Sequence, residues 1–362
     1  MTRQRNATID VARGFTVFIM PAVHSVLTYS TTAVQTSMLG KFLGFLAEGP
    51  GAELFMLLMG ISIVLGKKKS PKEIGYRSLQ LLGLAYLLNF FKIILPLCWH
   101  GIPMNVFTEN QIPYDLQGWF LLFQMGDILQ LAAIAYFVCS IIYRQKRYFI
   151  WAIGFGLFMN FITPFMWKIQ VQNVFLQVPF HLICGMPPNA FFPAFPWIVY
   201  PLLGLGIGAF ISSSNSKRFY SLLFLAGLVL VFIGKLIIPF EPIEWETDFY
   251  RLGPGGTLYH AGIAFMWLCL CYLSVKYIKG SWFFTLLTWL SKHITAVYCV
   301  QWIVIFWLSP LFSYHHLGLF GSLFSILFTT VLSFSLVYMG LMILEKRKQR
   351  NNKTLPCTTR QR

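Results

Sequence analysis

The chain has 362 residues, of which 57% are hydrophobic and only 11% are charged. A soluble protein of this size could not hide so much apolar surface, so the composition excludes a soluble globular protein. The formal net charge of +16 must therefore be explained in a membrane setting.

Apolar runs of about twenty residues recur along the chain, and each is long enough to cross a hydrocarbon core of roughly 30 Å. The short alternating runs typical of membrane strands are missing. We predict an all-α, polytopic integral membrane helical bundle of about ten transmembrane helices. In chain order, the predicted spans are residues 8–29, 51–67, 78–98, 119–143, 148–168, 195–212, 219–240, 257–278, 293–312 and 318–343.

The basic residues form short clusters in every second loop between these spans. The clusters are Arg3 and Arg5; Lys67, Lys68, Lys69 and Lys72; Arg144, Lys146 and Arg147; Lys217 and Arg218; Lys276 and Lys279; and Lys346, Arg347, Lys348 and Arg350. The residues that fall toward the other side are Lys41, Lys92, Lys168, Lys235 and Arg251. This positive-inside pattern predicts cytoplasmic N- and C-termini. The charge therefore indicates topology and contact with membrane lipid, and we expect no nucleic-acid partner.

The pattern predicts a single transmembrane domain over residues 1–345 and a disordered basic cytoplasmic tail over residues 346–362. Within the domain, the aromatic segment 282–290 is predicted to be an interfacial helix before the ninth span. None of the seven cysteines forms a C-x-x-C pair, and we expect no metal site.

The first span carries polar residues at a helical spacing. Arg13 and His24 are eleven residues apart, which is about 1100° of rotation and within about 20° of three full turns. Both side chains should therefore lie on one helix face, about 16 Å apart along the axis, and Asp10 shares that face as a supporting residue. Two plainer interpretations are that Arg13 anchors the helix at the interface and that His24 is a core histidine.

Glu53 follows the helix-breaking stretch Gly49–Gly51 and should lie in the first turn of a new helix. Glu53 is then expected at about the same membrane depth as His24. A carboxylate beside the His24 imidazole could fix its tautomer. The plainer interpretation is that Glu53 only complements the helix dipole.

Four further residues are candidates for binding a substrate. Asp127 is a carboxylate inside a predicted span, where a charge is costly and is a functional candidate by default, and Gln130 is its neighbour on the same helix. His260 lies near the outer end of the eighth span, as a second wall of the site or as an interfacial residue. Arg251, in the outer loop before it, is assigned to the same group.

Several stretches, in chain order, resemble one family. They are Arg13 and His24 in an R-x10-H spacing after Ile9 and Asp10; GAELFMLLMGIS at 51–62; GDILQLAAIAYF at 126–137; FPWIVYPLLGLGIGAFI at 195–211; and LSKHITAVYCVQWIVI at 290–305. They are similar to the membrane acyltransferases, namely the acyltransferase-3 proteins and the heparan-α-glucosaminide N-acetyltransferase-like proteins. The chain departs from the pattern with Met59-Gly60 in place of Ser-Gly and with Gln301 in place of a frequent His, which leaves the branch and the acceptor open.

The resemblance implies transfer of an acyl group, usually acetyl, from cytoplasmic acetyl-CoA or another acyl-CoA to an acceptor outside. The family's histidine corresponds to His24 and its arginine to Arg13. We expect His24 to act as a general base with Glu53 beside it, and an acyl-histidine intermediate is the open alternative. The CoA phosphates would bind near Arg13 or the inner cluster Lys67, Lys68 and Lys69.

The acceptor would be a cell-surface glycan or a small molecule, and the location a bacterial cytoplasmic membrane crossed many times. The sequence leaves homo-oligomer formation open. The alternative function is a transporter or flippase of a cell-envelope glycan or lipid-linked substrate, with His24, Glu53 and Asp127 as a proton relay. An inactive relative that supports a polysaccharide complex is also open.

Overall fold

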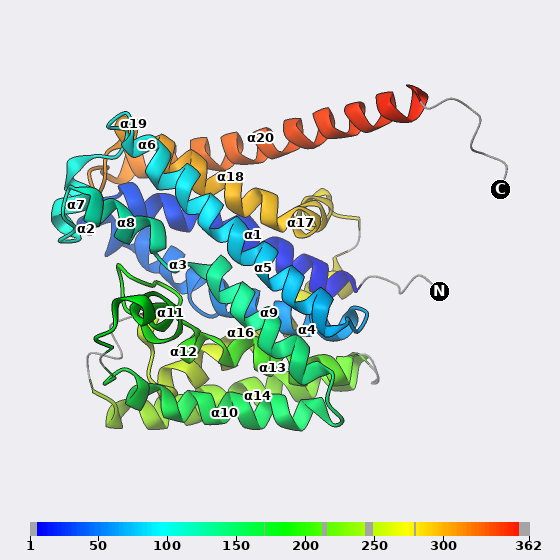
Figure 1. Ribbon diagram of the computed structural model, residues 1–362. Helices are drawn as coiled ribbons and strands as arrows, with labels where there is room; N and C mark the ends of the chain where they lie inside the picture. The colour runs from blue at the N-terminus through cyan, green and yellow to red at the C-terminus, as the bar shows by residue number, and fades with distance from the viewer. Residues whose placement is uncertain (1–5, 170, 212–215, 243–248, 279, 355–362) are drawn as a thin grey trace.

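The computed structural model describes residues 6–169, 171–211, 216–242, 249–278 and 280–354. In these ranges the regular secondary structure is helical, with two isolated β-bridges and no β-strand (Figure 1). The first half contains α1 (Ala7–Tyr29), α2 (Thr32–Gln35), α3 (Met38–Ala47), α4 (Ala52–Leu65), α5 (Pro71–Asn89), the π-helix η1 (Phe90–Ile94), α6 (Leu95–Leu97), α7 (Met104–Glu109), α8 (Leu116–Gln124), α9 (Ile128–Tyr143) and α10 (Tyr148–Met166).

The second half contains α11 (Val174–Cys184), α12 (Ala194–Trp197), α13 (Val199–Ile211), α14 (Ser216–Ile237), η2 (Ile238–Phe240), η3 (Phe249–Arg251), α16 (Pro254–Tyr277), α17 (Trp282–Lys292), α18 (Ile294–Trp307), α19 (Ser309–Phe312) and α20 (Leu319–Thr354). In the described part of the chain, eight helices are long and apolar enough to cross a membrane, or nine if α17 and α18 count as one bent span. The predicted all-α polytopic membrane fold is confirmed.

Three predicted features of the spans can be compared with the helices. The break at Gly49–Gly51 separates α3 from α4, and Gly49 has a φ of +78°, which favours glycine. The segment 282–290 forms the separate helix α17, at 87° to α18. The fourth predicted span, 119–143, is not one continuous helix, because α8 ends at Gln124 and α9 begins at Ile128.

The centre of the bundle depends on close helix contacts at glycine. A Cβ on Gly60 of α4 would lie 2.0 Å from the Pro201 carbonyl oxygen, and one on Gly204 of α13 would lie 2.0 Å from that of Leu57. Small residues let two membrane helices approach at backbone distance. In contrast, α14 and α20 lie at the periphery and expose long apolar side chains, as lipid-facing helices do.

The two ends of the bundle differ in charge and in loop length. α1 begins and α20 ends at the same end (Figure 1). The links from α4 to α5 and from α9 to α10, which carry Lys67–Lys69 and Arg144–Arg147, lie at that end too, and we call it the basic end. The opposite end, with α7 and α11, is called the loop end. The cytoplasmic location of the basic end stays a prediction.

Candidate active site

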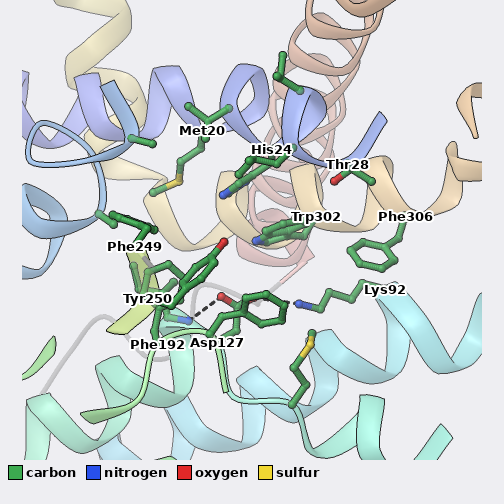
Figure 2. A pocket seen from close by; sticks show the side chains of 18 of the residues that line it. Met20, His24, Thr28, Lys92, Asp127, Phe192, Phe249, Tyr250, Trp302 and Phe306 are labelled. Carbon is green, nitrogen blue, oxygen red and sulfur yellow. Dashed lines mark hydrogen bonds and ion pairs between the residues drawn. The ribbon is translucent and has the colours of Figure 1, made fainter. Parts of the chain in front are cut away.

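A cavity of about 460 Å³ lies between α1, α3, η1, the start of α9 and α18. Most of its wall is apolar or aromatic, and Figure 2 shows some of the side chains that line it. Its polar and charged lining side chains include Thr16, His24, Thr28, Gln35, Glu48, Lys92, Asn110, Asp127, Tyr298, Ser309, Tyr314 and His315. A largely apolar cavity with a few converging polar groups is the usual form of a small-molecule site.

His24 projects from α1 into this cavity, toward Trp302 (Figure 2). Its Nδ1 lies 3.0 Å from the Oε1 of Gln301, and its ring stacks on Trp302 with 4.0 Å between centroids. With the amide in this orientation Nδ1 carries the proton, because a carbonyl oxygen can only accept. The Nε2 lone pair is then free to take a proton. The residue that orients His24 is therefore Gln301, and the expected contact with Glu53 is not formed.

Glu53 is fully buried and bonds to a different histidine. Its Oε2 accepts from the backbone N of Gly49 at 2.7 Å, and its Oε1 lies 2.8 Å from Nδ1 of His260. The glycine turn before α4 folds back over the carboxylate of the first helical turn, and α16 places His260 against it. Neither residue lines the cavity, although Glu48, 4.0 Å from His260 Nε2, does.

Asp127 forms an ion pair that the sequence analysis missed. Its Oδ2 lies 2.9 Å from Nζ of Lys92, which is 1% exposed. Asp127 is also the N-cap of α9, since its Oδ1 accepts from Ile128 N at 2.7 Å and its own N donates to Oε1 of Gln130 at 3.0 Å. The loop pattern groups Lys92 with the residues toward the outer side, although a lysine within the apolar run FFKII indicates a buried cation.

Arg13 does not line the cavity into which His24 projects. Its Nη2 donates to Oγ of Ser62 in α4, and its Nη1 is 4.0 Å from Oδ1 of Asp10. Asp10 also accepts from Oγ of Ser291 in α17 at 3.0 Å, so it ties α1 to α17. Arg13 and His24 both face neighbouring helices, and only His24 lines the large cavity. Arg13 reaches a second pocket only through its bond to Ser62, so Arg13 and His24 do not line one groove.

The second pocket lies at the basic end and has a volume of about 290 Å³. Ser62, the acceptor for Arg13, lines it together with Lys67, Lys69 and Arg144. Lys68 is placed nearby, 4.9 Å above the ring of Tyr143, which also lines the pocket.

The remaining predicted residue, Arg251, lies outside the cavity. Its guanidinium is 4.4 Å above the ring of Trp167 and donates to Sδ of Met186.

At the loop end of the cavity, burial raises the pKa of Tyr314, so its hydroxyl stays protonated and can donate to a ligand.

The chain is thus a helical membrane protein with a largely apolar cavity, an imidazole and an ion pair in its wall, and a second, basic pocket. The model of the family described as heparan-alpha-glucosaminide N-acetyltransferase, catalytic, matches residues 5–240. The chain belongs to this family of membrane acetyltransferases, which confirms the resemblance found in the sequence. A comparison with curated proteins gave no match. His24, Lys92 and Asp127 lie in the matched range, and Gln301 lies beyond it.

Proposed function

We propose that this protein transfers an acetyl group from cytoplasmic acetyl-CoA to an amine or hydroxyl group of an extracytoplasmic glycan. The observation that carries the proposal is His24, which lines the cavity, is held through Nδ1 by Gln301, and has no hydrogen-bond partner for Nε2 among the described residues. An imidazole in this state is a general base for acyl transfer.

The donor would enter from the basic end, which we place in the cytoplasm. Lys67, Lys69 and Arg144 surround the basic pocket and suit the phosphates of CoA, because charged N–H donors bind phosphate strongly. Arg13 lies at the edge of this pocket through Ser62. The pantetheine arm would then follow α1 for the roughly 16 Å that separates Arg13 from His24 along the helix.

The acceptor would enter the large cavity from the loop end. Its hydroxyl or amine gives a proton to Nε2 of His24 while its lone pair attacks the thioester carbonyl carbon. The tetrahedral intermediate then collapses, the C–S bond breaks, and the CoA thiolate takes the proton back from His24. Enclosure in the cavity keeps the thioester from water.

The acceptor class follows from the polar and aromatic groups at this end. Asn110 and Tyr314 offer hydrogen bonds, while Phe192, Phe249 and Tyr250 offer flat apolar faces for a sugar ring. We propose that the acceptor is a cell-envelope glycan. The protein would act on it from a bacterial cytoplasmic membrane, through a single domain over residues 1–345.

The test is a transfer assay with purified protein, labelled acetyl-CoA and a panel of amino sugars and neutral sugars. The variant His24→Ala should lower the rate by about 10²–10⁴-fold, the usual contribution of a general base. The matched control is His100→Ala, because His100 is exposed and its side chain bonds only to Tyr114 in the described structure. Wild-type rates in His24→Ala would remove His24 from the general-base role. Movement of a glycan across liposomes without loss of the thioester would refute the enzyme and favour a transporter.

A further inference from the structure

Lys92 is a buried cation in an irregular segment of helix. It is 1% exposed and lies in the five-residue π-helix η1, between α5 and α6. A π-bulge in a long helix is frequently found at a functional site. A lysine within a membrane span is costly and normally faces a cavity or a partner, and Lys92 has both.

The fold alone does not require this ion pair. Asp127 caps α9, but Asn or Ser caps a helix about as well as Asp and brings no charge. Without that charge, position 92 could hold an apolar residue, since apolar packing is often as stable as a buried ion pair. The breaks in backbone pairing near Asp127 are already covered by Asn89, whose Nδ2 donates to the carbonyls of Phe123 and Met125 at 2.9 and 2.8 Å. The charge on Lys92 therefore needs another explanation.

The position of Lys92 relative to His24 supplies one. Its Nζ lies 5.0 Å from the ring centroid of Trp302, the ring on which His24 stacks. Figure 2 shows Lys92 and Asp127 on one side of Trp302 and His24 on the other. Asp127 accepts a hydrogen bond from one of the three ammonium N–H groups of Lys92. The other two face aromatic rings and the cavity.

The reaction is favoured by a hydrogen-bond donor or a positive group here. Attack on a thioester moves an electron pair onto the carbonyl oxygen, and stabilising this oxyanion is usually the largest single contribution to acyl transfer. Among the described residues that line the cavity, Lys92 is the one lysine or arginine. The remaining charged lining residues, apart from the histidines, are Glu48 and Asp127, and both would repel an oxyanion.

Building on the proposed function, we propose that Lys92 is a catalytic residue whose ammonium group stabilises the thioester oxyanion, while Asp127 holds that group in position. The Lys92 ammonium group keeps all three of its protons throughout the reaction. The proton of the acceptor travels only through His24, and the electron pair on the carbonyl oxygen returns to the carbon as the C–S bond breaks.

The experiment compares Lys92→Met, Asp127→Asn and the double variant in the acetyl-CoA transfer assay, with thermal unfolding to check the fold. The matched control is Lys235→Met, because Lys235 also lies over an aromatic ring, 5.8 Å from that of Tyr259, but away from the cavity. Lys92→Met should lower kcat by about 10²–10³-fold, the range measured for loss of one oxyanion donor. Both KM values should change little, because the interaction forms only in the transition state.

The double variant separates catalysis from charge neutralisation. It contains no unpaired buried charge, so it should fold, yet it should be as slow as Lys92→Met. Ethylammonium added to Lys92→Ala should raise its rate by replacing the missing cation, which a purely structural lysine would not allow. A double variant that regains the wild-type rate, or an active Lys92→Met, overturns the role of Lys92.

Wild type and His24→Ala are measured in the same series. If wild type is active, His24→Ala is inactive and the double variant is active, the role of Lys92 fails and the proposed function stands. If wild type itself neither transfers acetyl nor cleaves the thioester, both proposals fail.

Discussion

The most direct test of how the site is organised is the variant Gln301→Met. Gln301 is completely buried, and its Oε1 bonds to Nδ1 of His24 at 3.0 Å. Its amide nitrogen has no hydrogen-bond partner among the described residues, so methionine, with a similar shape, removes only the one bond. The buried Nδ1–H of His24 is then left unsatisfied.

The size of the effect follows from that lost bond. A buried donor without a partner costs about 1–3 kcal/mol, which corresponds to about 5–150-fold in rate if the cost falls on the active arrangement of His24. The imidazole can also avoid the cost by moving its proton to Nε2, which removes the base from the cavity. We therefore expect kcat to fall by about 10–100-fold with little change in either KM.

The control is Ser25→Ala, at the next position of α1. Ser25 is buried and its Oγ lies 2.7 Å from Oγ1 of Thr329 in α20, so the variant also loses one buried hydrogen bond but not at the cavity. Both variants should lower the unfolding temperature by similar amounts, and only Gln301→Met should be slow in acetyl-CoA turnover. Equal kcat values in the two folded variants would show that Gln301 does not organise the base.

Two further predictions concern the donor site and the helix packing. Arg13→Ala should raise the KM for acetyl-CoA by about tenfold, as expected for loss of one charge-assisted hydrogen bond; donor titration against the exposed control Arg77→Ala tests this, and unchanged donor affinity excludes Arg13 from the donor site. Gly60→Ala should cost about 1–3 kcal/mol of stability, because its Cβ would overlap the Pro201 carbonyl. Thermal unfolding should show no such loss in Gly83→Ala, where nothing lies within 4 Å of the new Cβ.

The features that could be predicted from the sequence are those set by neighbouring residues. Apolar runs of sufficient length indicated the spans, and the stretch Gly49–Gly51 indicated the break before α4. The interval between Arg13 and His24 placed both on one helix, because the rotation per residue is fixed. The capping box of Asp127 and Gln130 was present as well, but the carboxylate was interpreted only as a membrane charge.

The partners of the site residues could not be predicted in the same way. Glu53 and His24 have similar depths, but depth does not fix the direction in which a side chain points around its helix. That direction depends on helix packing, which joins Glu53 to His260 across 207 residues and His24 to Gln301 across 277. Arg13 and His24 do not share one groove for the same reason. Arg13 bonds to Ser62 of α4, whereas His24 bonds to Gln301 of α18.

The site lies where the helices are interrupted, and this has a physical cause. Non-helical backbone at membrane depth is tolerated only where it is buried in protein or lines a cavity. The interruptions at Gly49–Gly51, Phe90–Ile94 and Met125–Asp127 all contribute lining residues to the same cavity. At the last of them, Gly126 bonds through its N to the Asn189 carbonyl at 2.8 Å, so the freed backbone is paired inside the protein. Each interruption removes a stretch of regular helix from the centre of the bundle and leaves room there for a polar substrate. Asp127 lies at the last of these breaks as the N-cap of α9, and Lys92 lies in the π-helix η1, so two of the interruptions carry the ion pair on which the proposed chemistry depends.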